Sequence, residues 1–194
     1  MINMITSIEQ VRLVLQKFQD YYTRRDPALL DTFLELLADD DLEVIGTGGA
    51  QPGQGEWHLG RRAAREIFLG DWKSWGDLRL DVPEAHIRVN GKTAWLSATA
   101  TISMTIPVEQ EYADYLAYIQ KYIDTSAASA EEKLLYILRG GSNTLYELRR
   151  GEQFTWPMRF TAVLVLHSAE WKFAQMQFSF PTTHFPDVRI LENA

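Results

Sequence analysis

The feature that most constrains the fold is a pair of long apolar stretches near the C-terminal end of the sequence. Residues 159–166 (RFTAVLVL) and residues 171–181 (WKFAQMQFSFP) are rich in branched and aromatic side chains, which is typical of β-strands. Only the four residues from His167 to Glu170 separate them, so we expect the two strands to pair as a hairpin. Because long strands twist and bend within a sheet, this hairpin predicts a curved sheet that closes over a cavity.

The two faces of the predicted strands differ in composition, because successive residues of a strand point to opposite sides of the sheet. A third strand, predicted over residues 93–106 after the turn signal Asn90-Gly91, shows the same division. We expect the apolar side to pack on helices, the only other large buried surface available. The apolar faces carry Ala94, Leu96, Ala98, Ala100, Ile102, Phe160, Ala162, Leu164, Leu166, Ala174, Met176, Phe178 and Phe180.

The opposite faces mix aromatic side chains with polar ones and are more aromatic than an ordinary solvent-exposed sheet. Trp and Arg are enriched at subunit interfaces, where hydrogen bonds are also made. We therefore predict a homodimer formed sheet to sheet through this outer face, with an ordinary solvent-exposed face as the alternative. The predicted interface residues are Trp95, Thr99, Arg159, Thr161, Trp171, Gln175 and Gln177, and strict alternation places Phe173 among them.

Helical periodicity dominates the first part of the chain. Ser7 with Gln10 predicts a capping box at the start of the first helix, and Asp26-Pro27 predicts the cap and first residue of the second. The predicted helices cover residues 7–25, 27–37 and 60–72, and the predicted strands cover residues 42–47 and 78–89, the latter interrupted at Pro83.

Residues 107–151 break the strand pattern and are predicted to form a helical insertion within a single domain that spans residues 1–194. Tyrosine, leucine and isoleucine recur three and four residues apart over residues 112–123, which predicts a helix with an aromatic stripe. Ser129 with Glu132 predicts a capping box for a second helix, and Gly140-Gly141 is expected to end it. Such an insertion could cover the cavity or extend the dimer contact.

Composition excludes several classes of function. A net charge of −7 argues against nucleic-acid binding, and we expect the arginine pairs 24–25, 61–62 and 149–150 to lie on solvated surface. The sequence has no cysteine, no apolar run of membrane-spanning length and no visible secretion signal, so a cytoplasmic chain without membrane contact is predicted. The four histidines lie far apart, and no metal-binding or cofactor motif is present, so neither group is expected.

The order of the predicted elements resembles a known family. Residues 44–47 (VIGT) lead through a glycine-rich loop over residues 46–55 to Glu56-Trp57, and residues 94–98 (AWLSA) precede the closing hairpin. Together these segments are similar to the SnoaL-like branch of the NTF2-like superfamily. The resemblance implies an α+β, cystatin-like cone in which a curved antiparallel sheet is combined with N-terminal helices. This fold hosts isomerases, cyclases, dehydratases and non-catalytic binding modules, so it leaves the function open.

The resemblance also bears on the choice between binding and catalysis. Many relatives hold a histidine where Gln177 stands and an aspartate where Gly48 stands. Our first hypothesis is therefore a protein that binds a small, largely apolar molecule in the cone without a defined catalytic residue. Its predicted pocket consists of Trp57, Phe68, Trp72, Leu96, Phe160, Met176 and Phe178.

Two alternatives remain open. The second hypothesis is an isomerase-type or cyclase-type enzyme that transfers a proton through a buried carboxylate or histidine. Glu56 and His58 are its predicted catalytic residues, although Glu56 as an anchor of the glycine-rich loop and His58 as a rim residue are the alternatives. Asp71 is a further candidate, with Tyr22 as hydrogen-bond donor. A buried carboxylate within hydrogen-bond distance of a tyrosine would favour this hypothesis. The third hypothesis is a non-catalytic dimerisation module whose insertion binds a partner helix.

Overall fold

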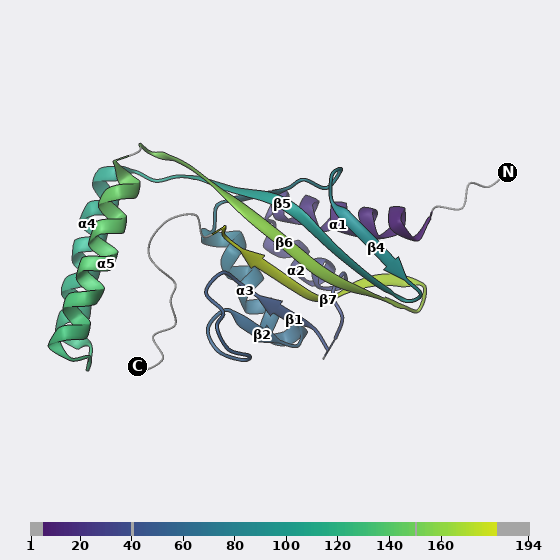
Figure 1. The fold of residues 1–194 in the computed structure, drawn as a ribbon, viewed down its shortest axis with the longest axis horizontal. Coiled ribbons are helices and arrows are strands. Elements are labelled where there is room, and N and C mark those ends of the chain that lie inside the picture. The colour runs from purple at the N-terminus through teal and green to yellow at the C-terminus, as the bar shows by residue number, and fades with distance from the viewer. Residues whose placement is uncertain (1–5, 40, 150, 182–194) are drawn as a thin grey trace. The chain divides into compact units, whose positions relative to one another are not determined.

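The computed structural model describes residues 6–39, 41–149 and 151–181 (Figure 1). These residues form two compact units. The first runs up to Ser103 and resumes over Thr155–Pro181, and the second is Met104–Phe154. The second unit brackets the insertion predicted over residues 107–151, and the first contains the helices and strands that build the candidate site.

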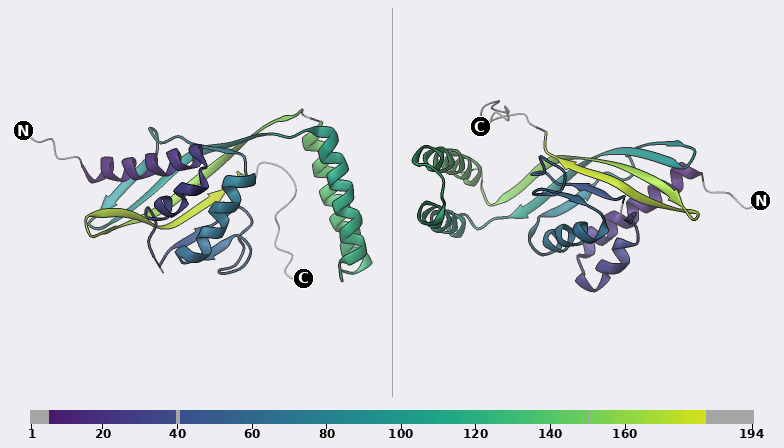
Figure 2. Two further views of the ribbon diagram at one scale, coloured as in Figure 1. Left: turned by 180° about the vertical axis from the view of Figure 1, so that it is seen from behind. Right: turned by 90° about the horizontal axis from the view of Figure 1, so that it is seen from below.

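A mixed β-sheet organises the first unit. Its seven strands follow the order β2-β1-β7-β6-β5-β3, with β4 also paired to β5. The pair β1–β7 is parallel, which corrects the prediction of a wholly antiparallel sheet. The sheet is curved and open (Figure 2), and the predicted α+β class is confirmed. The strands are β1 (Glu43–Ile45), β2 (Trp57–Leu59), β3 (Asp77–Leu80), β4 (His86–Asn90), β5 (Thr93–Thr105), β6 (Gln153–His167) and β7 (Glu170–Ser179).

Helices cover one face of this sheet (Figure 2). They are α1 (Ser7–Arg24), the 3₁₀ turn η1 (Pro27–Leu29), α2 (Leu30–Leu34) and α3 (Arg61–Ser74). The capping box of α1 lies one residue before the predicted one, because Thr6 and Glu9 exchange the two hydrogen bonds that close it. Asp26 caps the following turn by accepting from the Ala28 amide, as Asp26-Pro27 predicted.

The β6–β7 hairpin closes more tightly than the sequence suggested. Its strands run up to His167 and from Glu170, which leaves Ser168 and Ala169 as a two-residue turn. Both turn residues have positive φ, 48° and 69°, as the twist of a short hairpin requires. The predicted four-residue turn is therefore wrong by one residue at each end.

A β-bulge divides this hairpin into two segments of opposite phase. Gln175 pairs with Val163, but Phe173 pairs with the next residue, Leu164, so Ala174 is an extra residue on β7. An extra residue exchanges the two faces of a strand, because side chains alternate with a period of two. The alternation predicted for β7 therefore holds only after Ala174.

The bulge changes which side chains of β7 face the helices. Trp171 and Phe173 are buried before it, and Met176 and Phe178 are buried after it. The Trp171 indole N–H donates to Gln10 on α1 at 3.3 Å. The prediction that Trp171 lies on the outer face with the dimer-interface residues is therefore wrong, because strict alternation was assumed across the bulge.

An aromatic cluster fills the space between the sheet and the helices. On β5 and β6 the alternation is as predicted, with the apolar positions from Ala94 to Ile102 and from Phe160 to Leu164 buried. Phe18 on α1 lies at the centre of the cluster and is fully buried. Its ring centroid is 4.9 to 6.5 Å from those of Tyr22, Phe33, Phe160, Phe173 and Phe178.

The second unit is a helical hairpin of α4 (Val108–Thr125) and α5 (Ala130–Leu148). Ser129 and Glu132 form the predicted capping box. The predicted break at Gly140-Gly141 is wrong, because α5 continues through both glycines. Glycine at position 140 instead makes room for α4, because a Cβ atom there would lie 2.5 Å from the Tyr115 hydroxyl. In the described part of the chain, no helix is both long and apolar enough to cross a bilayer.

The two glycines of α5 provide a matched test of this contact. We expect Gly140→Ala to weaken the hairpin, because its methyl group would meet Tyr115, and Gly141→Ala to strengthen it. A Cβ at Gly141 would lie an ordinary 3.7 Å from the same hydroxyl, and alanine favours a helix over glycine by about 1 kcal/mol. Hydrogen exchange of the α4 and α5 amides, followed by mass spectrometry, measures both effects. Faster exchange in Gly141→Ala than in Gly140→Ala would contradict the assigned contact.

Candidate functional site

A small pocket of about 60 Å³ opens where the glycine-rich loop, α3 and β7 meet. The carboxylates of Glu56 and Asp71 line the pocket, and its other lining residues are small or largely apolar. Since one water molecule occupies about 30 Å³ of liquid, the pocket has room for only a small chemical group. Its lining residues are Gly46, Thr47, Glu56, Ile67, Asp71, Trp75 and Phe178.

The carboxylate of Asp71 is held by a buried tyrosine. Asp71 lies on α3, and its Oδ2 accepts a hydrogen bond of 3.0 Å from the hydroxyl of Tyr22 on α1. Tyr22 is only 2% exposed, and its ring packs against Phe18 and Phe68. Among the described residues, none donates a hydrogen bond to Oδ1 of Asp71. One oxygen is thus fixed by the protein, and the other remains free to accept a hydrogen bond or a proton.

Burial raises the pKa of Asp71 to about 7, because the charged carboxylate loses solvation in this environment. The Tyr22 hydrogen bond and the Arg25 charge lower the pKa, and the nearby Glu56 carboxylate raises it, but desolvation is the largest effect. Burial also raises the pKa of Tyr22 well above its usual value, and the adjacent Asp71 adds to this shift. Near neutral pH, Tyr22 therefore remains a hydrogen-bond donor, while Asp71 exists in both protonation states.

Arg25 fixes the end of α1 against the segment that follows α3. It occupies the C-cap of α1 with a left-handed backbone (φ 50°), and its guanidinium donates to the carbonyl oxygens of Trp75 and Gly76. The same group forms an ion pair with Asp77 at 3.0 Å. These contacts hold together the two helix ends that carry Tyr22 and Asp71. Arg25 is therefore a positioning residue, not the solvated surface residue that the arginine pair predicted.

Arg61, a member of another pair, is likewise well packed. Its guanidinium donates to the Leu37 carbonyl oxygen at 2.6 Å and pairs with Asp39 at 2.7 Å. It ties the first turn of α3 to the chain that follows α2. The prediction of solvated surface is therefore wrong for Arg25 and Arg61, because arginine pairs can use backbone carbonyl oxygens that a sequence does not reveal.

Glu56 holds the glycine-rich loop. Its Oε2 accepts from the Gly48 amide at 2.7 Å and from the Thr47 hydroxyl at 3.4 Å. A Cβ atom at Gly46 would lie 2.5 Å from the same oxygen, so glycine is needed there for the carboxylate to approach. The described contacts of Glu56 are those of a structural anchor at the rim of the pocket.

The other predicted catalytic residue lies outside this pocket. His58 is half-buried on β2, pairs with Val44 across the sheet, and is not in the pocket lining. Its neighbour Trp57 donates its indole N–H to Glu43 at 2.8 Å. Asp71 and Tyr22, weighed as further candidates, are the pair that the structure brings together.

Most of the predicted ligand pocket is packed core. Phe178 lies at the border between the core and the small pocket, and its ring centroid is 5.0 Å from that of Phe160. The indole N–H of Trp72 is buried and has no hydrogen-bond partner among the described residues. An unpaired buried donor is uncommon in proteins and adds a polar group to the region around Tyr22. The fully packed members of the predicted set are Phe68, Trp72, Leu96, Phe160 and Met176.

Trp75 and Ile67 complete the pocket wall, and the sequence had suggested Trp75 as one of the aromatic residues that could line an entrance for a flat apolar ligand. Trp75 packs edge-on against Phe178 at 5.9 Å, and Ile67 lies one turn before Asp71 on α3. The i, i+4 spacing of Ile67 and Asp71 indicated a shared helix face. No comparable pattern marked Arg25, because its role depends on a left-handed helix end.

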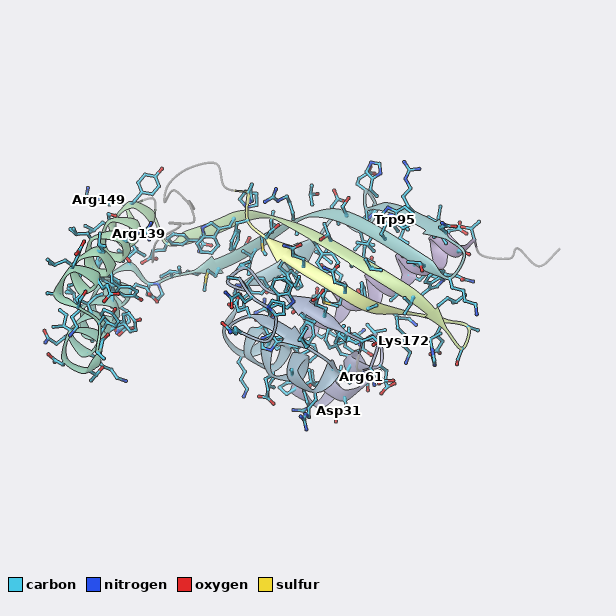
Figure 3. All side chains as sticks on the ribbon, turned by 60° about the horizontal axis from the view of Figure 1, so that its bottom comes forward. Asp31, Arg61, Trp95, Arg139, Arg149 and Lys172 are labelled. Atoms are coloured by element: carbon cyan, nitrogen blue, oxygen red, sulfur yellow. The ribbon has the colours of Figure 1, made fainter. Side chains whose placement is uncertain are left out.

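The outer face of the sheet carries a second, shallower hollow of about 410 Å³. Trp95, which is 48% exposed, stands on this face of β5 (Figure 3). Among the predicted interface residues, Thr161 and Gln175 line the hollow with Trp95. Thr99, Arg159 and Gln177 are exposed nearby on the same strands, and Arg159 donates to the Phe180 carbonyl oxygen. In the described ranges, no group of three or more metal-binding side chains gathers at either place.

The SnoaL-like domain family matches residues 11–120 of the sequence. The chain belongs to this family. The match begins within α1, includes β5 and ends within α4. A comparison with curated proteins finds no match.

Solved structures confirm the NTF2-like, cystatin-like fold. An NTF2-like family protein from Streptomyces avermitilis, described as a "putative dehydratase", is 16% identical with a TM-score of 0.53, over 90% of this chain and 95% of that one. A cystatin-like protein from Novosphingobium aromaticivorans is 12% identical with a TM-score of 0.55, over 91% and 82%. A Pseudomonas putida NTF2-like protein is 10% identical with a TM-score of 0.53, over 90% and 87%. At these identities the likeness concerns the fold alone.

The raised pKa of Asp71 predicts a pH-dependent effect of Asp71→Asn on stability. The folded state holds the proton up to about pH 7, whereas an unfolded aspartate releases it near pH 4. The wild-type free energy of unfolding should therefore fall as the pH rises from about 4 to 7. Asparagine does not titrate, so the variant should gain roughly 2–4 kcal/mol over the wild type across this range.

Urea unfolding at pH 5, 6, 7 and 8 measures this difference. Asp20→Asn, on the exposed side of α1, is the matched control and should show a nearly constant difference from the wild type. A difference that does not change with pH for Asp71→Asn would show that its carboxyl titrates as an ordinary surface group.

Proposed function

We propose that the protein binds a small, largely apolar carbonyl compound at the Asp71 pocket and transfers a proton on it. The observation that carries this proposal is the 3.0 Å hydrogen bond between Tyr22 and a largely buried Asp71 whose pKa is about 7. A general base is most effective when its pKa lies near the working pH. This geometry favours the proton-transfer hypothesis over binding without a catalytic residue.

The chemistry needs few groups. With Oδ2 held by Tyr22, the second carboxylate oxygen of Asp71 takes the proton from the carbon next to the substrate carbonyl. The electron pair of that C–H bond moves to the carbonyl oxygen and forms an enolate. If the substrate has a β,γ double bond, protonated Asp71 returns the proton to the γ-carbon and the double bond shifts, which completes an isomerisation. If it has a β-hydroxyl group, Asp71 donates the proton to that oxygen, the C–O bond breaks as the enolate re-forms the carbonyl, and water leaves, which completes a dehydration.

The size of the pocket limits how the substrate binds. About 60 Å³ admits the reacting carbonyl and its neighbouring carbon, so the remainder of the molecule must lie outside. Trp75 and Phe178 supply an apolar wall at this opening. The glycine-rich loop over residues 46–55 borders it, and we expect this loop to shift when the substrate enters. The similarity in fold to the protein described as a "putative dehydratase" is compatible with this reaction class.

Exchange of carbon-bound hydrogen in D₂O tests proton abstraction without knowledge of the natural substrate. A panel of cyclic and aryl ketones is incubated with the protein, and the loss of the α-proton signal is followed by NMR. We expect protein-dependent exchange that accelerates as the pH rises through about 7, because only the deprotonated carboxylate accepts a proton. Asp71→Asn should slow it by about 10²-fold or more, and Tyr22→Phe by less.

Two further variants separate the candidate bases. His58→Ala should leave the exchange unchanged, since His58 lies outside the pocket lining. If Glu56→Gln abolishes the exchange and Asp71→Asn does not, Glu56 is the base and the assignment to Asp71 is wrong. Ligand binding by saturation-transfer NMR, with no exchange for any ketone of the panel, would instead support the binding protein without a catalytic residue.

We also propose that the outer face of the sheet forms a homodimer. The supporting observation is the exposed Trp95 beside the hollow that contains Thr161 and Gln175. A tryptophan in the middle of a polar strand face is typical of the centre of an interface. The proposed interface excludes Trp171, which packs against α1.

Substitution at the centre of this face tests the contact. We expect Trp95→Ala to raise the dissociation constant of the sheet-to-sheet contact by at least tenfold, since central tryptophans often contribute 2 kcal/mol or more. Sedimentation equilibrium at micromolar concentration measures it, and Thr93→Ala at the start of the same strand is the control. An unchanged distribution of masses in Trp95→Ala would overturn the assignment of this face.

A further inference from the structure

The hairpin of α4 and α5 carries more exposed apolar side chains than its own contacts bury. Among its described residues, only Ile119 and Leu148 are buried. The large apolar side chains that remain exposed are Leu116, Tyr118, Ile123, Leu134, Leu135, Tyr136, Leu138, Leu145 and Tyr146. A two-helix layer normally buries such side chains against a further layer.

The tyrosines mark one side of the hairpin. The hydroxyl groups of Tyr118 and Tyr136 are 2.8 Å apart, and the rings of Tyr122 and Tyr136 stack at 4.5 Å. These contacts bridge the two helices along one edge of their interface. The residues on the opposite side of each helix can therefore be located by counting from Tyr118 on α4 and from Tyr136 on α5.

A stripe of aliphatic side chains lies on that opposite side. Leu116 lies two residues before Tyr118, and Leu138 lies two residues after Tyr136. At 100° per residue, each leucine is about 200° around its helix from that tyrosine. On α4, Ile123 follows Leu116 by seven residues. On α5, Leu134, Leu138 and Leu145 are spaced by four and seven residues, so the residues of each helix share one face. The aliphatic stripe consists of Leu116, Ile123, Leu134, Leu138 and Leu145, whose exposed fractions range from 37% to 67%.

On each helix, the stripe residues belong to a longer row of residues, here called the seam, whose spacing is that of a coiled coil. On α5, residues 134, 138, 141, 145 and 148 alternate steps of four and three, and residues 112, 116, 119 and 123 do so on α4. Each seam holds one residue that the hairpin buries itself, Leu148 or Ile119, and others that it exposes. On each helix one of these residues is therefore buried within the hairpin, and the exposed leucine and isoleucine side chains require a facing helix.

The exposed area fits a protein interface. Five aliphatic residues that are 37% to 67% exposed present an apolar surface on the order of a few hundred Å², the size of patch that is often functional on a protein surface. A standard interface buries about 800 Å² on each partner, of which roughly 60% is non-polar. The stripe thus supplies much of the apolar part of one side of a standard interface.

We infer that the aliphatic stripe packs against the same stripe of a second copy, so that two hairpins form a four-helix bundle. An uncharged stripe of leucine and isoleucine is complementary to itself, as a two-fold interface requires. Two antiparallel hairpins joined through such seams give the usual packing of a four-helix bundle. This association is separate from the sheet-to-sheet contact and does not depend on the chemistry at Asp71.

The absence of cysteine from the sequence permits an unambiguous cross-linking test. Leu134→Cys, Leu138→Cys and Leu145→Cys are prepared singly in the full chain and treated with a short bismaleimide at micromolar concentration. We expect covalent dimers from at least one position on the stripe. Leu13→Cys, at a similarly exposed leucine on α1 of the first unit, is the matched control and should remain uncross-linked.

A charge on the stripe provides the second measurement. In the Trp95→Ala background, which weakens the proposed sheet contact, Leu138→Glu should convert the remaining dimer to a monomer, and Leu13→Glu should leave the mass unchanged. Circular dichroism confirms the helix content, and Leu134→Ser with Leu138→Ser replaces the glutamate variant if that variant does not fold. Absence of cross-links together with an unchanged mass would overturn the inference and indicate that the stripe is covered by its own chain. A wild type that stays unassociated but binds lipid vesicles would also overturn it.

Discussion

The packing of α1 against the sheet is the constraint on which both the core and the candidate site depend. Phe18 lies at the centre of the aromatic cluster, and Tyr22 follows it by one helical turn, so the same apolar stripe leads from the core to the pocket. The position of the Tyr22 hydroxyl is therefore set by ring packing against Phe18, Phe33 and Phe68. Because rings in a close-packed interior have little freedom, the hydrogen bond to Asp71 needs no reorganisation.

The balance of effects at Asp71 can be judged from its pKa. A shift from 3.8 to about 7 corresponds to roughly 4 kcal/mol in favour of the neutral carboxyl. A hydrogen bond to a charged group contributes about 1.5–3 kcal/mol in the other direction, and Tyr22 supplies one. Desolvation by the aromatic cluster thus exceeds the combined stabilisation from Tyr22 and Arg25. The same packing that stabilises the fold therefore keeps a proton on this carboxyl at near-neutral pH.

Sequence patterns predicted those parts of the fold that depend on local spacing. Helical periodicity located α1, α3 and the hairpin, and alternation located the buried faces of β5 and β6. The errors arose where one residue changes the geometry without a pattern of its own. Ala174 is an ordinary strand residue in the sequence, yet as the bulge it moves Trp171 to the buried face. Gly140 was expected to end a helix, but its missing side chain makes room for Tyr115 across the hairpin.

The candidate site was only partly predictable for a related reason. Asp71 and Tyr22 were recognised as titratable or polar residues on apolar helices, but the sequence does not show that residues 49 positions apart meet. Their meeting depends on Arg25, whose left-handed conformation ends α1 and whose guanidinium binds the carbonyl oxygens after α3. A site assembled from two helix ends is thus fixed by backbone contacts, which no pattern of side chains encodes. Glu56 stands out in the sequence beside the glycine-rich loop, and in the structure it serves mainly to hold that loop. Asp71 is less conspicuous in the sequence, but its burial gives it the environment of a base.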